Sequence, residues 1–358
     1  MHSYDFAFES SRDCRPVCSM NDNMHISRIA WVDTLKGIAI ILVVIVHNAD
    51  ESVSDFLRCF IMPLFFLLSG FLFSPKTVKA YFHKSTRRLI VPYIAYLIVI
   101  ALPYIILMGI NGELFETKGK SLLINMLYGG ELLKGAFGVF WFISVLWLAT
   151  NLFNYLLNFV NRMFTGEGRW KCAVVGILIP IGYLAESIPY PLPGNLHVVP
   201  MATAYIGIGY WIHRSISRFP SRFRAKDKLY YVSISAAVML CVFILRHELT
   251  LDMKYNNYGI PGISFMSSLS ASLCMACLAI VLSDNWIGNM LGFIGKASMT
   301  IMYLHQPIKF MLLNYLGLQD NHFIAVICGI LLSLVAYWFL KQTNVPRKIF
   351  LADKVRNG

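Results

Sequence analysis

Ten apolar segments long enough to cross a membrane follow one another along the sequence. A spanning helix needs about 20 mostly apolar residues, and a chain with 57% apolar and only 14% charged residues supplies such stretches repeatedly. The mean hydropathy of +0.60 also exceeds that of ordinary soluble proteins. The predicted spans cover residues 37–47, 54–73, 89–110, 137–160, 172–188, 197–213, 229–245, 262–283, 298–317 and 323–340. We therefore expect an all-α integral membrane protein with about ten transmembrane helices.

The basic residues predict how these helices are oriented. If the N-terminus lies inside, 24 of the 31 lysine and arginine residues fall in segments on the inner side of the membrane. Such a bias is typical of cytoplasmic loops, so we expect both termini in the cytoplasm. It also explains the net charge of +12 without a nucleic-acid partner, because basic juxtamembrane loops face anionic membrane lipid.

One polytopic membrane domain is expected over residues 28–341, followed by a basic cytoplasmic tail over 342–358. Residues 1–27 are polar and lack the apolar core of a cleavable signal peptide. We expect them to be a disordered tail, or to lie outside the protein if Met20 or Met24 is the true start. The eight cysteines are scattered and form neither a disulfide framework nor a zinc site, so no metal is expected.

The first span, in DTLKGIAIILVVIVHN (residues 33–48), carries three ionisable residues. Lys36 and His47 are 11 positions apart, so they project from nearly one helix face, about three turns or 16 Å apart. Asp33 lies three positions before Lys36, a spacing at which the two side chains can pair. These residues are either interfacial anchors or, since all three share a face, part of a site.

Basic residues also gather before the third span, in HKSTRRLIVPY (residues 83–93). Lys84, Arg87 and Arg88 are either ordinary inside-facing anchors or a clamp for a ligand that carries phosphate.

Polar and aromatic residues inside other spans allow two readings as well. Ser69 either permits close helix packing or faces a pocket, and Trp141 belongs to an interfacial belt or a platform for sugar stacking. Ser298 and His305 lie in the ninth span, where a buried histidine is either hydrogen-bonded across the bundle or part of a site.

Taken together, the motifs resemble the acyltransferase family 3 membrane proteins, and among them the fucose 4-O-acetylase-like branch. The resemblance covers residues 28–340. It rests on R-x-x-x-x-D-x-L-K-G-I-A-I ending in His47, F-x-M-P-L-F-F-L-L-S-G-F-L-F, R-R-L-I-V-P-Y, F-W-F-I-S and G-K-A-S-M-x-I-M-Y-L-H-Q-P, in this order.

The resemblance implies an enzyme of the bacterial cytoplasmic membrane. It would move an acyl group, commonly acetyl, from cytosolic acyl-CoA to a hydroxyl of a cell-surface carbohydrate or its lipid-linked precursor. Acetyl-CoA would be the donor substrate, and no permanently bound cofactor is implied. His47 matches the essential histidine of the family, and Lys36 stands where many members have arginine. The other matches are Lys84-x-x-Arg87 with Arg88 after it, Ser69, Ser298 and His305.

Two roles suit His47 in such a reaction. A neutral imidazole can take the proton of the acceptor hydroxyl, or it can attack the thioester and carry the acyl group itself. CoA phosphates would lie at Lys84, Arg87, Arg88 and Lys36, with Asp33 beside Lys36. The acceptor would contact the short loops 48–54, 111–136, 189–196 and 246–261.

Other functions stay open at this stage. The chief alternative is a transporter or flippase for a lipid-linked or small anionic substrate, although the prolines in the spans show no two-fold pattern. A sensor or an assembly protein is a third class, and a peptide or lipid acceptor is an alternative within the enzyme reading.

Overall fold

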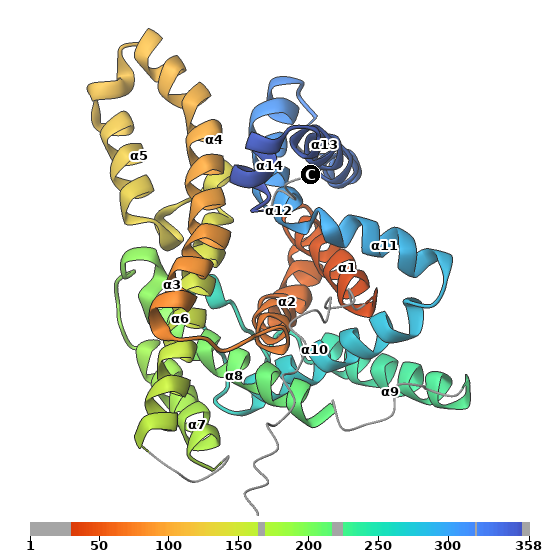
Figure 1. Cartoon of the computed structure of the whole chain (residues 1–358). Coiled ribbons are helices and arrows are strands. Elements are labelled where there is room, and N and C mark those ends of the chain that lie inside the picture. The colour runs from red at the N-terminus through yellow and green to blue at the C-terminus, as the bar shows by residue number, and fades with distance from the viewer. Residues whose placement is uncertain (1–29, 164–168, 217–224, 319–320, 353–358) are drawn as a thin grey trace, which may run out of the picture.

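The computed structural model describes residues 30–163, 169–216, 225–318 and 321–352, and these residues are almost entirely helical (Figure 1). An isolated bridge between Asp252 and Asn257 is the extended pairing found within these ranges. The longer helices in chain order are α1 (Ala30–Val46), α2 (Glu51–Phe71), α3 (Val78–Ser85), α4 (Val91–Ile110), α5 (Thr117–Tyr128), α6 (Phe140–Met163), α7 (Arg169–Ala185), α8 (Val199–Ile216), α9 (Ala225–Ile244), α10 (Ile263–Leu282), α11 (Trp286–Lys296), α12 (Ser298–Pro307), α13 (His322–Gln342) and α14 (Asn344–Phe350).

A helix lies in each of the ten ranges expected to span a membrane, which confirms the all-helical fold class. Within the described ranges, five helical segments are long and apolar enough to cross a bilayer: Glu51–Phe71, Val78–Ile110, Gly135–Met163, Ile263–Leu282 and His322–Gln342. The count of ten spans and the cytoplasmic position of both termini stay predictions. The tail expected over residues 1–27 lies outside the described residues.

The α1 and α2 helices form the centre of the bundle, where α1 packs on α2, α10, α11 and α12, and α2 packs on α8 and α10 (Figure 1). Glycines allow two of these contacts. The carbonyl oxygen of Leu291 on α11 occupies the place of a side chain at Gly37, and that of Ile206 on α8 does so at Gly70. Backbones that approach so closely gain dispersion contacts, so they hold α1 and its polar residues in a fixed place.

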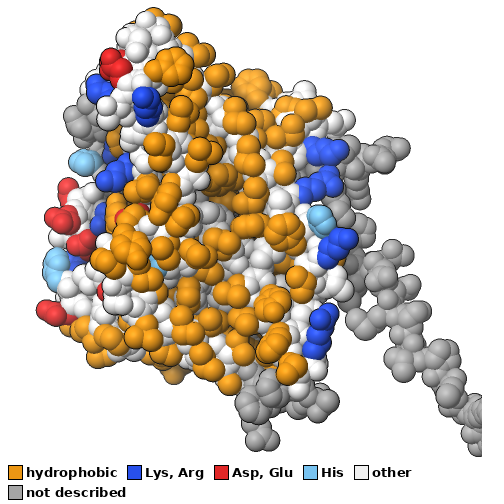
Figure 2. All heavy atoms as spheres, turned by 90° about the vertical axis from the view of Figure 1, so that its left-hand side faces the viewer, with side chains coloured by type: hydrophobic (Ala, Val, Ile, Leu, Met, Phe, Trp, Pro, Cys, Tyr) orange, Lys and Arg blue, Asp and Glu red, His pale blue; other side chains and the backbone are white. Residues whose placement is uncertain are grey.

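The α4 helix presents a broad apolar face outward. Its exposed side chains include Ile94, Ile98, Leu102 and Ile106. Figure 2 shows this side of the molecule covered with hydrophobic side chains, with charged ones gathered at its two edges. An apolar surface of this extent between two charged rims suits the hydrocarbon core of a bilayer.

The expected C-terminal tail is partly folded onto the bundle. Within 342–358, residues 344–350 form α14, which packs on α4. Its Phe350 ring lies 5.1 Å from that of Tyr96, measured between centroids. This part of the predicted tail therefore closes the bundle beside α4.

Candidate functional site

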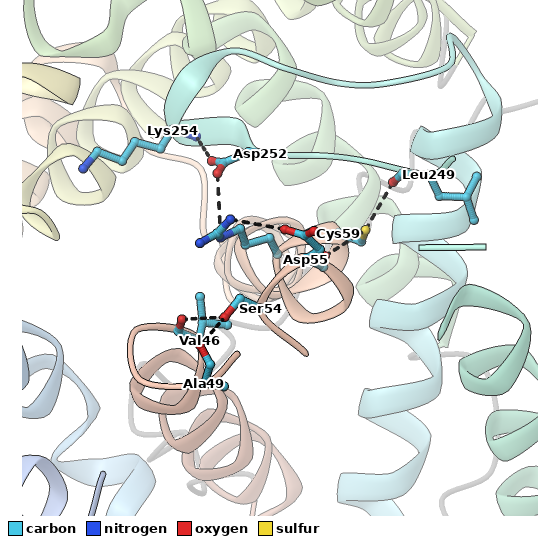
Figure 3. Close-up of polar contacts among 9 residues, drawn as sticks. Val46, Ala49, Ser54, Asp55, Cys59, Leu249, Asp252 and Lys254 are labelled. Atoms are coloured by element: carbon cyan, nitrogen blue, oxygen red, sulfur yellow. Dashed lines mark hydrogen bonds and ion pairs between the residues drawn. The ribbon is translucent and has the colours of Figure 1, made fainter. Parts of the chain in front are cut away.

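The turn after α1 fixes the position of His47. The Ser54 hydroxyl, in the first turn of α2, lies 2.9 Å from the carbonyl oxygen of Val46 and 3.2 Å from that of Ala49 (Figure 3). From the other side, the ammonium of Lys309 donates to the His47 carbonyl oxygen at 2.8 Å. Two separate elements thus hold the backbone that carries the imidazole.

A first cavity of about 250 Å³ runs along α1 and reaches the imidazole of His47. Lys36, Ile40, Val43 and His47 line it, which confirms that Lys36 and His47 share one helix face. Of the residues proposed from the sequence, those that line this cavity are His47, Lys36, Ser69, Lys84, Arg88, Trp141 and Ser298. Most of the expected site is therefore brought together around one space.

The basic end of this cavity is formed by Lys36, Lys84 and Arg88, whereas Arg87 is exposed and does not line the cavity. The cause is a π-helical turn at Thr86–Ile90. Its hydrogen bonds span five residues, so the turn is wider than in an α-helix. Residues four apart then stay on one face and those three apart diverge. Arg88, four positions after Lys84, therefore lines the cavity together with Lys84.

Asp33 lies beside the cavity without lining it. Its carboxylate is buried and sits 3.6 Å from the Lys36 ammonium, which confirms the pairing expected from their spacing. The carboxylate holds the ammonium at the cavity end that is about 16 Å from His47 along the helix. It is too far from the imidazole to orient it directly.

His305 does not line the cavity but lies against His47. The two ring centroids are 5.2 Å apart, and the rings are inclined by 32°. The His305 ring is buried, and its Nδ1 lies 2.8 Å from the carbonyl oxygen of Ile301. A carbonyl only accepts, so Nδ1 carries the hydrogen and Nε2 has a free lone pair. This Nε2 is buried and has no hydrogen-bond partner among the described residues.

A second cavity, of about 350 Å³, lies at the other end of α1. Both cavities are lined by Val43, His47, Met62 and Trp141, so they adjoin at the imidazole. The rest of the second lining includes charged and polar side chains as well as apolar ones: Val46, Arg58, Ile61, Lys134, Gly135, Gly138, Asp252, Lys254, Tyr255, Gln306 and Phe310. His47 is exposed although it lies among helices, because it faces these two spaces.

The sequence did carry a signal for this second group. Arg58, Lys134 and Lys254 belong to the seven basic residues that fall outside the predicted inner segments. They do not follow the charge bias, and the structure places all three at one cavity. Basic residues that oppose the bias were therefore the sequence signal for this second group.

Arg58 and Asp252 join α2 to the loop at residues 246–261. The Arg58 guanidinium lies 3.3 Å from Asp55 and 3.9 Å from Asp252 (Figure 3). Asp252 also accepts the backbone N–H of Lys254 at 3.0 Å. Burial raises the pKa of the Asp252 carboxyl, and the nearby Arg58 charge opposes this rise. The carboxylate is therefore held between a cation and a backbone donor.

The Lys254 side chain extends away from Asp252 (Figure 3). Its ammonium donates to the carbonyl oxygens of Leu133 and Gly138, each at 3.2 Å. Burial lowers the pKa of this ammonium, an effect that the Asp252 charge opposes. Lys254 thereby fastens the loop at 246–261 to the segment that leads into α6.

Asn195 ties three of the predicted acceptor loops together. Its side-chain oxygen accepts the backbone N–H of Glu131 at 2.6 Å, and its side-chain nitrogen donates to the carbonyl oxygen of Lys254 at 2.9 Å. The residue is fully buried and has a left-handed backbone with φ of 58°, a conformation that asparagine tolerates. Parts of the loops 111–136, 189–196 and 246–261 therefore form one unit beside the second cavity.

Comparison with known proteins bears on this arrangement. The model of a known family, described as an acyltransferase domain, matches residues 29–341. Neither the curated proteins nor the solved structures gave a match. The match covers both cavities and His47 between them.

Proposed function

Because the chain belongs to the acyltransferase family 3 of membrane proteins, we propose that it moves an acyl group between two substrates held in its two cavities. The donor is acyl-CoA, with acetyl as the group, in the cavity that ends at Lys36, Lys84 and Arg88. The acceptor is a hydroxyl of a carbohydrate or a lipid-linked precursor in the cavity beside Arg58 and Lys254. Membership of an acyltransferase family does not favour the alternative function of a transporter or flippase.

The observation that carries this proposal is that His47 lines both cavities. Acyl transfer needs a base or nucleophile that reaches donor carbonyl and acceptor hydroxyl at once or in turn. The basic end of the donor cavity suits the phosphates of CoA. The pantetheine arm then runs along the face of α1 toward the imidazole.

The charge pattern supports the sidedness of the two substrates. Lys36, Lys84 and Arg88 belong to the basic residues that the positive-inside bias assigns to the cytoplasm, whereas Arg58 and Lys254 do not. In this arrangement the donor comes from the cytosol and the acceptor sits at the outer face of the bacterial cytoplasmic membrane.

Two chemical courses fit the position of His47. As general base, its neutral nitrogen takes the hydroxyl proton while the oxygen attacks the thioester carbonyl, and CoA leaves as the thiolate that takes up a proton. As acyl carrier, the same nitrogen attacks the thioester, CoA leaves, and the acceptor oxygen then displaces imidazole from the acyl group. Both courses consume one acyl-CoA and one hydroxyl and yield free CoA and an ester.

The proposed reaction is tested with the purified full-length protein in detergent. We expect saturable binding of acetyl-CoA in a thermal-shift assay, and release of free CoA that speeds up when glycosides are added. Mass spectrometry should find the acetyl group as an ester on the glycoside. Absence of binding by any acyl-CoA would contradict the proposal, and so would binding without acyl transfer to any glycoside in a broad panel.

His305 is expected to act as a positioning residue for His47, because its ring lies against that of His47 and its buried Nε2 has no hydrogen-bond partner among the described residues. Once His47 gains a proton or a partial charge, an N–H directed at that lone pair stabilises it. A hydrogen bond to a charged group contributes about 1.5–3 kcal/mol, so His305→Phe should lower kcat about 10- to 100-fold. The KM for acetyl-CoA should change little. The measurement is a pair of kinetic profiles against pH for the wild type and the variant.

A purely structural role for His305 predicts a different result. Phenylalanine keeps the ring shape and the contact with His47 but offers no lone pair, whereas His305→Asn restores a polar partner in part. Recovery of kcat in the asparagine variant, at equal melting temperature, supports positioning. Equal kcat in wild type and the phenylalanine variant contradicts it.

A further inference from the structure

The second cavity has an excess of positive charge. Arg58, Lys134 and Lys254 line it against a single lining carboxylate, that of Asp252. Asp55 contacts Arg58, and Glu131 interacts electrostatically with Lys134 and Lys254. The lining itself therefore carries two more cations than anions, in a setting where nearby protein weakens screening by water.

Two of these cations, Arg58 and Lys134, can still bind a ligand. The Arg58 guanidinium uses Nη1 and Nε for its two carboxylates, and its side chain is 43% exposed. Lys134 is exposed and forms no hydrogen bond or ion pair with another described residue. Lys254 differs, since its ammonium is bound to two backbone carbonyls. An anion in the cavity would thus bind at Lys134 and the outer edge of Arg58.

A buried polar atom without a partner among the described residues belongs to the lining of the same cavity. Gln306 is 5% exposed and lines the cavity, and its Oε1 has no hydrogen-bond partner among the described residues. A buried acceptor without a donor is destabilising, and a ligand hydroxyl would supply the missing donor. Gln306 follows His305, whose ring contacts His47, so such a hydroxyl would lie near the reacting imidazole.

Aromatic side chains complete the lining. Trp141, Tyr255 and Phe310 face the cavity, and their flat apolar surfaces suit the C–H faces of a sugar ring. The three features of cations, a hydroxyl acceptor and aromatic faces lie in one space of about 350 Å³, within the size range of small-molecule sites.

We propose that the acceptor is an anionic sugar, whose carboxylate or phosphate lies at Lys134 and Arg58 while a hydroxyl lies at Gln306 and His47. This inference rests on the proposed function, because it names the acceptor class for the same reaction. It also assigns a binding role to residues that sequence patterns did not single out. A neutral sugar would not give Lys134, which has no ion pair with a described residue, a charged partner in the cavity.

The test measures binding to the full-length protein in detergent by calorimetry, without any acyl donor. Three probes share one ring: methyl glucoside, methyl glucuronoside and methyl glucoside phosphate, and the series is repeated on galactose. We expect the anionic member to bind about tenfold more tightly than its neutral parent, since one charge-assisted contact contributes about that much. Raising NaCl from about 0.05 M to about 0.5 M should reduce this preference.

Lys134→Ala should weaken binding of the anionic sugar about tenfold and leave the neutral one unchanged. Lys348→Ala is the matched control, because Lys348 is exposed on α14, outside the predicted acceptor loops, and lines neither cavity. If only the uronoside, or only the sugar phosphate, binds more tightly than the neutral sugar, the proposal is supported and the anion is identified.

The inference would be wrong if the neutral sugars bind as tightly as the anionic sugars, or more tightly, or if no anionic sugar binds. It would also be wrong if Lys134→Ala weakens the binding of neutral and anionic sugars equally. Binding of inorganic phosphate as tight as that of the sugar phosphate would also reject a sugar site.

Acetyl-CoA binding is measured in parallel. If the protein does not bind acetyl-CoA, the proposed function is contradicted. If it binds acetyl-CoA but does not prefer anionic sugars, the proposed acceptor class alone is contradicted.

Discussion

Replacing His47 with alanine is expected to lower the rate of acetyl transfer by about 10²- to 10⁴-fold, the range that a positioned general acid or base contributes. The loss should appear in kcat, with little change in acetyl-CoA binding, because the proposed site for the phosphates of CoA is at the distant basic end of the first cavity. The measurement is release of free CoA in the presence of a glycoside acceptor, together with a thermal-shift titration of acetyl-CoA.

The control for this variant is His322→Ala, since His322 is exposed at the start of α13 and lines neither cavity. It should retain the activity of the wild type. Near-normal transfer by His47→Ala would remove the imidazole from the mechanism. A single-turnover experiment without acceptor separates its two roles, because acyl-histidine formation predicts one equivalent of CoA released and an acetyl group that hydroxylamine removes.

Replacing Lys84 and Arg88 together with alanine is expected to raise the KM for acetyl-CoA about 30- to 900-fold, because each of the two contacts to phosphate contributes on the order of 1–2 kcal/mol at an exposed site. The KM for the acceptor should stay within about twofold of the wild type, since these residues lie at the opposite cavity from the loops that bind it. Initial rates at varied concentrations of each substrate give both constants.

Arg87→Ala is the matched control, because Arg87 is adjacent, basic and exposed but does not line the cavity. It should change the KM for acetyl-CoA little. If Arg87→Ala has the larger effect and Arg88→Ala the smaller, the spacing of the family motif governs CoA binding rather than the π-helical turn. An increase in acceptor KM alone would place the donor elsewhere.

Periodicity in the sequence was sufficient for the helices and for relations within one helix. The ion pair of Asp33 with Lys36, and the shared face of Lys36 and His47, follow from the regular rise of α1. The choice of Arg88 over Arg87 could not be predicted, because it depends on a local π-helical turn that hydrophobicity does not reveal. A change of one backbone hydrogen-bond register redirects the side chains after it.

Contacts between distant segments were beyond sequence patterns. His305 was predicted either to be hydrogen-bonded across the bundle or to belong to a site, and its position against the His47 ring follows from the packing of α12 on α1, which the sequence does not show. Arg58, Lys134 and Lys254 come from three segments that Asn195 and Asp252 bring together. A single sequence shows the charge of each residue but not which loops meet.

The residues that surround His47 where the two cavities meet affect how easily a charge can pass between the cavities. Besides the imidazole, the residues common to both cavities are Val43, Met62 and Trp141, and none of them carries a charge. A charge that leaves water for such a low-dielectric passage loses several kcal/mol of hydration, whereas a neutral acetyl group loses almost none. If the proposed acyl transfer takes place here, the junction would let a neutral acetyl group pass from one cavity to the other while it hinders the passage of ions.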